Sequence, residues 1–228
     1  PFSDVRIAWS VVSVIDPFLT PVLGACVIAA LWRDTNAWAS AGIATVACYL
    51  ALGSVQHERA EWGIRSLAGQ RGHHTTKVVV KPTLGNLVVW RGIYVAENQY
   101  WIDAVRVAWP GTTLAYPGSS ISPANTGTQS GLSSVQRTDV DRFTRLSEGF
   151  VVTHPDHPNV LGDIRYAMQP NGIRPLWGIE LNQGGPAEHV RWRTFRAWDA
   201  VAWERFTRML WGDVIDEPII KSETTEKG

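Results

Sequence analysis

The chain begins with two long apolar runs, and the spacing of apolar residues changes after them. Residues 11–32 and 37–56 contain one charged residue between them, Asp16. About 20 helical residues cross the hydrocarbon core of a bilayer, so each run is long enough to span it. The polar link between the runs is flanked by Trp32 and Trp38, and tryptophan is enriched at membrane interfaces. The pattern predicts a membrane α-helical hairpin with spans at about 11–32 and 37–56.

The second run continues into a mixed polar and apolar stretch, which predicts a surface helix to about residue 70. The link between the spans carries one basic residue, Arg33, beside Asp34. Five basic residues closely follow the second span: Arg59, Arg65, Arg71, Lys77 and Lys81. By the positive-inside rule, we expect a multi-pass protein of the cell inner membrane with a cytoplasmic C-terminal domain. A buried hairpin of a soluble protein remains the alternative, because both runs are rich in alanine.

From residue 75 the apolar residues occur in short runs rich in Val, Ile, Tyr and Trp, which is typical of strands. The predicted strands are 75–80, 87–96, 99–107, 149–154, 160–168 and 175–181. Short connections favour antiparallel pairing. The expected fold class is therefore a membrane hairpin plus an α+β domain, whose antiparallel sheet has about five or six strands.

Helical elements and boundaries complete this prediction. Residues 116–136 are rich in Ser, Gly, Pro and Thr and predict a flexible loop, and 139–147 predicts a short helix. Apolar residues at helical spacing from Phe195 to Met209 predict an amphipathic helix that ends at Gly212 and covers the sheet. We expect a membrane region at 1–72, an α+β domain at 73–212 and a disordered tail at 213–228.

Composition narrows the partners. The chain has 21 basic and 21 acidic residues, so its net charge of zero does not favour nucleic acid as a partner. Cys26 and Cys48 lie in the apolar runs and imply no disulfide framework. The chain begins with Pro1 and shows no signal peptide, so we expect it to be the C-terminal portion of a protein whose N-terminal part is missing here. The lipid bilayer and that N-terminal part are the expected partners.

Several phrases together resemble the YdjM-like inner-membrane family, some members of which are under LexA control. They are PFSD at 1–4, IDP at 15–17, Tyr49 followed by Gln56, His57 and Ala60, NLVVWRGIY at 86–94, and GDIRY at 162–166. The family is described as metal-dependent hydrolases. Its D-x-L-T-H and H-R-x-x-T-H-S segments, which look like metal motifs, do not occur in this chain.

The resemblance implies a metal site, for which three polar residues of this chain are candidates. If the spans form an antiparallel hairpin, Gly53 is level with Asp16, and His57 lies four residues further, roughly 6 Å along the axis. Asp4 would reach the same membrane face. Carboxylates and imidazoles bind zinc and similar divalent ions, so Asp4, Asp16 and His57 are the candidate metal ligands.

In this hypothesis Asp16 and His57 are also the catalytic candidates. A bound divalent ion would lower the pKa of a water molecule toward about 7, and a nearby carboxylate would accept the proton. Each residue has a simpler alternative. Asp16 precedes Pro17 and is well placed to cap a helix, Asp4 would be a solvated surface acid, and His57 an interfacial histidine.

Other polar residues carry weaker hypotheses. Trp90, Arg91, Asp163 and Arg165 would form a polar groove, or Asp163 and Arg165 would form an internal salt bridge. The HPDH cluster at 154–157 would be a solvated hairpin loop, with adventitious metal binding as the alternative.

The main functional hypothesis is a membrane-bound metal-dependent hydrolase acting on an unknown substrate, such as a phosphoester or a lipid-derived ester. The alternative is a non-enzymatic membrane-anchored module that binds or regulates a partner in a stress response.

Overall fold

The computed structural model describes residues 16–33, 35–83, 85–108, 111–127, 131–182, 188–196 and 200–215. Within these ranges the chain forms four helices and two antiparallel sheets, an α+β fold. The helices are α1 (Leu19–Arg33), α2 (Asn36–Gln70), α3 (Ser134–Leu146) and α4 (Ala200–Trp211).

The strands divide between the two sheets. The first sheet has the order β1-β2-β3-β4, with β5 paired to β3, and the second has the order β6-β7-β8-β9. The first sheet consists of β1 (Lys77–Pro82), β2 (Val89–Ala96), β3 (Gln99–Val107), β4 (Thr113–Tyr116) and β5 (Ser120–Ile121). The second consists of β6 (Val151–His154), β7 (His157–Asp163), β8 (Trp177–Glu180) and β9 (Arg191–Thr194).

The single sheet of five or six strands expected from the sequence is therefore wrong, although the antiparallel α+β class is confirmed. The strands before and after residue 121 pair only within their own group. The two groups then pack against each other, because Ile93 and Ile102 of the first sheet share a buried cluster with Val152 of β6 and with Phe150, which directly precedes β6. Strand periodicity shows which residues face inward but not which strands are neighbours.

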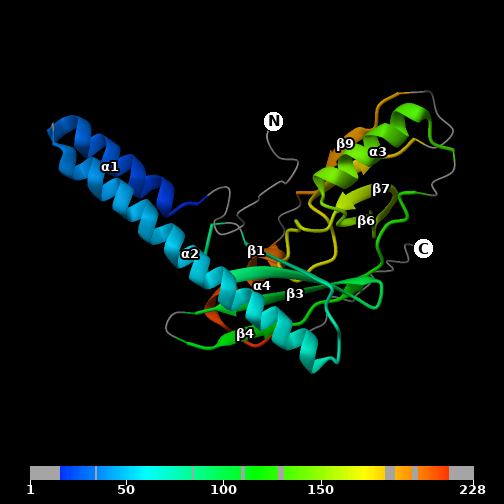
Figure 1. Cartoon of the computed structure of the whole chain (residues 1–228), viewed down its shortest axis with the longest axis horizontal. Coiled ribbons are helices and arrows are strands. Elements are labelled where there is room, and N and C mark those ends of the chain that lie inside the picture. The colour runs from blue at the N-terminus through cyan, green and yellow to red at the C-terminus, as the bar shows by residue number, and fades with distance from the viewer. Residues whose placement is uncertain are drawn as a thin grey trace.

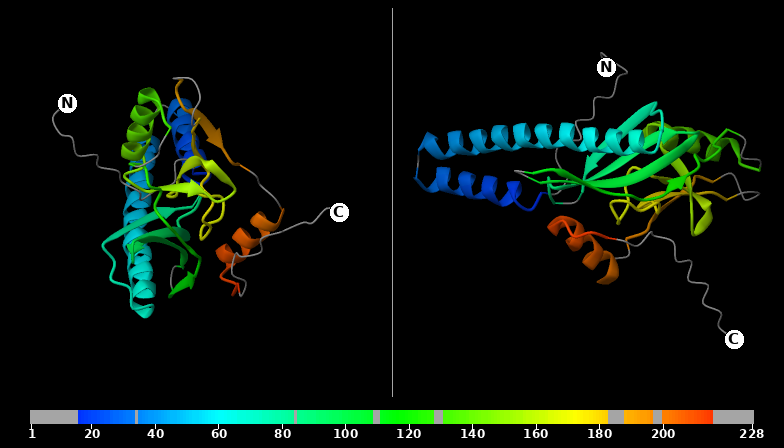
Figure 2. Two further views of the ribbon diagram at one scale, coloured as in Figure 1. Left: turned by 90° about the vertical axis from the view of Figure 1, so that its right-hand side faces the viewer. Right: turned by 90° about the horizontal axis from the view of Figure 1, so that it is seen from below.

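The first sheet is the middle layer of the fold. Because successive side chains of a strand point to opposite faces, Trp90 and Tyr94 face α2, whereas Val89 faces α4. The α2 face buries Ile64 and Val105 with them. Figure 2 shows α2 and α4 on opposite sides of this sheet. The predicted C-terminal helix thus covers the sheet as expected.

The N-terminal helices form a hairpin that extends away from both sheets (Figure 1). The helix α2 is continuous over 35 residues, and its second half, from Gln56 onward, lies on the first sheet. In its first half, Gly42 approaches Cys26 of α1, where an added Cβ would lie 3.3 Å from the Cβ atom of Cys26. The predicted continuation of the second span to about residue 70 is confirmed.

Several predicted boundaries move. Residues 116–136 were expected to form a loop, but they contain β5, and α3 begins at Ser134 after Ser133 caps it by accepting the Gln136 amide. The strand β9 was not predicted. Phe195 does not belong to α4, because its ring stacks on His157 instead. The predicted tail lies mostly outside the described residues.

Candidate functional site

Asp16 lies at the base of the hairpin and caps α1. Its Oδ1 accepts hydrogen bonds from the amides of Phe18 and Leu19, at 2.9 Å each, and its Oδ2 accepts the hydroxyl of Tyr49 on α2. The residue is 4% exposed. Both carboxylate oxygens are thus engaged within the protein, so the capping alternative is confirmed. Carboxylates that bind metals are also held by hydrogen bonds from neighbouring groups, so Asp16 as a metal ligand stays a prediction.

His57 lies further along α2 than the partner of Asp16. Tyr49 precedes it by eight residues, which is about 12 Å of helix rise. The imidazole ring meets the indole of Trp90 edge to face, with ring centroids 5.7 Å apart. Asp4 lies outside the described residues. The described part of the chain contains no group of three or more His, Cys, Asp or Glu side chains placed to hold a metal ion.

The family-like phrase around residue 56 forms the joint between the hairpin and the first sheet. The buried Gln56 side chain donates from Nε2 to the carbonyls of Leu87 (3.2 Å) and Val107 (2.8 Å), at the ends of two strands. Arg59 donates to Gln56 Oε1 at 2.8 Å and to the carbonyl of Ala108 at 3.0 Å. These bonds fix the direction of α2 relative to the sheet.

The NLVVWRGIY phrase serves the same joint from the sheet side. Asn86 Oδ1 accepts the amides of Val88 and Val89 at 2.9 and 2.7 Å, which shapes the entry into β2. Trp90 donates from Nε1 to the carbonyl of Leu87 at 3.0 Å. Asn86 and Trp90 therefore bind backbone groups at the start of β2 and hold this segment in place.

The predicted polar groove is not formed. Trp90 and Arg91 are neighbours on a strand and point to opposite faces of the sheet, and both are buried. Asp163 and Arg165 instead form the internal salt bridge that was the alternative, with Arg165 Nη2 2.8 Å from Asp163 Oδ2. Arg165 Nη1 also pairs with Glu148 at 2.7 Å.

Arg91 holds the two sheets together. Its guanidinium donates to the carbonyls of Ile164 (2.7 Å) and Pro170 (2.8 Å), which lie beyond β7. Burial lowers the pKa of Arg91, and the nearby carboxylate of Asp163 offsets part of that effect. Three backbone carbonyls, including that of Gln169, surround a charge that has left water. Its environment indicates a structural role.

The HPDH cluster forms the hairpin turn expected from the sequence, with Pro155 and Asp156 exposed, but His154 departs from the expectation because it is buried. His154 is 3% exposed, and its ring lies 4.8 Å from that of His157 and 4.2 Å from that of Phe195. Its Nδ1 accepts the amide of Asp156 at 3.2 Å, while the Asp156 carboxylate pairs with Arg174 at 2.7 Å. The two histidines therefore pack with Phe195, while the turn between them stays exposed to solvent.

Sequence reasoning missed two polar partners. Tyr49 is the one tyrosine of the second run. The sequence predicted that Gly53 lies level with Asp16, whereas in the structure Tyr49, one helical turn earlier, is its partner. Asp103 is fully buried and pairs with Arg71 at 2.7 Å, at the far end of α2. A charged residue inside an otherwise apolar strand was the available signal for this pair.

The chain was compared with protein families, curated proteins and solved structures. No protein-family model matches the chain, and neither a curated protein nor a solved structure gives a significant match. The resemblance to the YdjM-like family stays a prediction from the motifs.

Proposed function

We propose that this protein is an integral membrane protein whose α1–α2 hairpin is embedded in the bilayer and whose two sheets form a binding or regulatory module at its surface. The observation that carries the proposal is the exposed apolar surface of the hairpin. Large apolar side chains there face outward, including Val27 at 58%, Leu31 at 77% and Ile43 at 72% exposure. An apolar surface of this extent is typical of a membrane or protein contact.

The low burial of the apolar part of α2 supports a membrane span over a core helix. Within the described residues, α2 is the one helix long and apolar enough to cross a membrane, and 11% of its apolar window is buried. A core helix of a soluble protein would be mostly buried. The shorter α1 rises about 22 Å over its 15 residues and lies against the first half of α2.

The binding module is favoured over the metal-dependent hydrolase because the polar candidates are engaged inside the fold. Asp16 caps α1 and accepts the hydroxyl of Tyr49, and the ring of His57 packs against Trp90. If the full-length protein were a metalloenzyme that used Asp16 and His57, Asp16→Ala or His57→Ala would lower the content of bound divalent metal. We expect equal metal content in both variants and the parent, measured by elemental analysis of purified protein.

Extraction of membranes tests the anchor. The parent protein should stay in the membrane pellet after an alkaline carbonate wash. A double variant with Val27→Lys and Ile43→Lys places two charges near the middle of the hairpin, each costing about 3 kcal/mol of insertion free energy. We expect this variant to shift to the extracted fraction.

The control is Trp192→Lys, since Trp192 is 52% exposed on β9, away from the hairpin. This variant should remain in the pellet like the parent. Release of the parent by carbonate would contradict the membrane anchor.

A further inference from the structure

The helix α4 has an exposed aromatic side that the sheet does not cover. Phe206 and Met209 are buried against the first sheet, and Trp211, at the C-terminal end of the helix, is 81% exposed. Trp203 and Val214 are also more than half exposed, at 52% and 66%. Trp203 and Trp211 are eight residues apart, which places them about two turns apart along the helix and about 80° apart around it.

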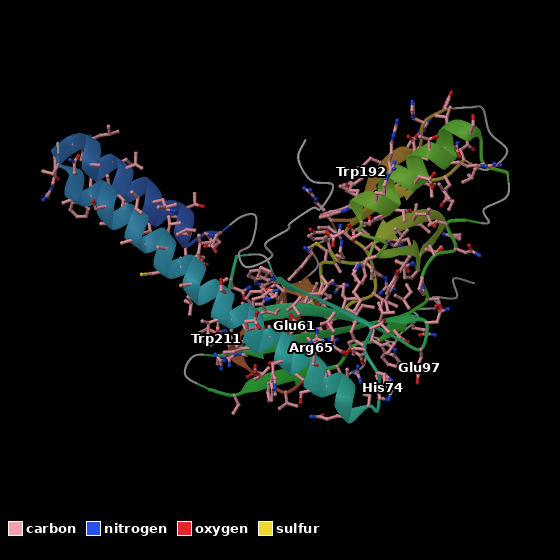
Figure 3. All side chains as sticks on the ribbon, in the orientation of Figure 1. Glu61, Arg65, His74, Glu97, Trp192 and Trp211 are labelled. Carbon is pink, nitrogen blue, oxygen red and sulfur yellow. The ribbon has the colours of Figure 1, made fainter. Side chains whose placement is uncertain are left out.

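Hydrogen bonds place the end of α4 at the base of the hairpin. Gln56, directly after the second apolar run, binds the carbonyl of Val107 at 2.8 Å. The neighbouring Arg106 donates from Nε to the carbonyl of Leu210 at 2.8 Å. Gln56, the end of β3 and the end of α4 therefore lie at one level of the molecule. Figure 3 shows Trp211 at the end of the first sheet nearer the hairpin and His74 and Glu97 at the opposite end.

This level is where the bilayer surface falls if the hairpin is embedded. From Asn36 to Val55 the helix rises about 30 Å, the thickness of the hydrocarbon core. The headgroup layer then begins near Gln56. Phe18, at the start of α1, is 68% exposed at the same end of the hairpin. Indole rings partition into the headgroup layer because their apolar body and polar N–H match it.

We infer that α4 is a second membrane contact, which inserts Trp211 into the headgroup layer of the same bilayer that holds the hairpin. The inference rests on the proposed anchoring of α1 and α2. The charges of this helix side are mixed, since Arg208 lies 4.0 Å from Asp213 and Glu204 is exposed. Insertion therefore depends on the indole, and a neutral phosphatidylcholine surface suffices. With α2 on one face of the sheet and α4 on the other, two contacts fix the tilt of the sheet against the membrane.

Quenching by spin-labelled lipid tests the inference in the full chain. The native cysteines are replaced (Cys26→Ala, Cys48→Ala), and one cysteine is introduced for a bimane label by Val214→Cys, His74→Cys or Val27→Cys. Val214 follows α4 closely and is 66% exposed, so a label there reports on the end of α4 while the indole of Trp211 is kept. Each labelled protein is reconstituted into phosphatidylcholine vesicles with and without lipid that carries a nitroxide on its headgroup or in its acyl chain. We expect the headgroup nitroxide to quench the label at 214 and the acyl-chain nitroxide to quench the label at 27, while the label at 74 stays unquenched. Adding Trp211→Ala should remove the quenching at 214.

The outcomes separate the two proposals. Quenching at 27 without quenching at 214 overturns the α4 contact and leaves the anchor intact. The absence of quenching at 27 overturns the anchor and, with it, the α4 contact. If the label at 214 is shielded from water without lipid quenching, in proportion to the protein-to-lipid ratio, a second copy of the chain covers α4 and the inference is wrong. The exposed positions of Val214 and Trp211 make their replacement compatible with folding.

Discussion

Asp16 shows at the scale of one residue how a polar group is tolerated beside an apolar hairpin. Its two oxygens accept two amides and one hydroxyl, so the carboxylate has replaced its water with protein donors. A buried acceptor satisfied in this way stabilises the helix start, whereas an unsatisfied one would destabilise it.

Substitution of this residue should affect the stability of the hairpin. We expect Asp16→Ala to lower the free energy of unfolding by about 1–2 kcal/mol, because it removes the cap and the Tyr49 partner together. Tyr49→Phe should cost less, and it should cost almost nothing further in the Asp16→Ala background. Unfolding of the detergent-solubilised protein with SDS measures all three. Additive effects would show that the two side chains are not coupled.

His154 makes a pH dependence measurable at the same scale. Burial lowers the pKa of His154 below its ordinary value, the neighbouring His157 and Arg174 lower it as well, and the Asp156 carboxylate offsets part of this. As the pH falls through about 6.5, the unfolded chain takes up the proton first, so the stability contributed by neutral His154 is present above that pH and is lost below it.

We therefore expect the urea midpoint of the full chain to fall between pH 7 and pH 5, and to fall less in His154→Phe, whose ring still packs against Phe195. His74→Phe, at an exposed position, is the control and should keep the dependence of the parent. An equal pH dependence in His154→Phe and the parent would assign it to other groups.

At the scale of elements, glycine allows α2 to lie close to the sheet. A Cβ at Gly92 of β2 would overlap the side chain of Ile64, and one at Gly63 of α2 would lie 2.7 Å from Thr113 Cγ2. At each position a side chain from one element, Ile64 or Thr113, therefore packs directly onto a glycine of the other. The seating of α2 on the sheet, and with it the direction of the hairpin, depends on this contact.

Gly92→Ala should lower the free energy of unfolding by about 1–3 kcal/mol, because overpacking forces α2 away from the strand. Adding Ile64→Ala should make the pair less destabilising than the sum of the two single changes, since it removes the overlapping atoms. Gly69→Ala is the control, because its Cβ meets no atom within 4 Å and alanine favours the helix. Chemical unfolding of the four variants gives the comparison.

At the scale of the whole molecule, α2 is one continuous helix that connects the hairpin to the first sheet, which in turn packs against the second. Its first half carries no charge, and its second half is bound to the sheet by Gln56 and Arg59. The sheets therefore cannot rotate freely relative to the hairpin. The side of the membrane on which they lie follows from the orientation of this one helix.

We expect that side to be the cytoplasm, because basic residues follow the second span while Arg33 in the link is balanced by Asp34. Two reporters are fused in turn after Gly228. The reporter that functions only in the cytoplasm should be active, and the reporter that functions only in the periplasm should be inactive. Activity of the periplasmic reporter would reverse the proposed topology.

The candidate site was predictable where its contacts are local. The Asp16-Pro17 pair indicates a helix cap, because the carboxylate bonds to amides two and three residues away. The ion pair of Asp163 with Arg165 is likewise local, because the two residues are two positions apart in the sequence. The prediction of a polar groove was wrong because it required Arg91 and Asp163 to be exposed to solvent. Arg91 is instead enclosed by backbone carbonyls of residues that are more than 70 positions away in the sequence.

The sequence by itself determined the two apolar helices, the continuation of the second to residue 70 and the antiparallel α+β class, since hydrophobic periodicity and capping act over a few residues. Tertiary structure alone decided that the strands form two sheets, that Tyr49 meets Asp16 and that His154 is buried. It also placed the end of α4 beside the base of the hairpin. These features depend on which distant surfaces pack together, and the free energy of such packing is not encoded in any single stretch of the chain.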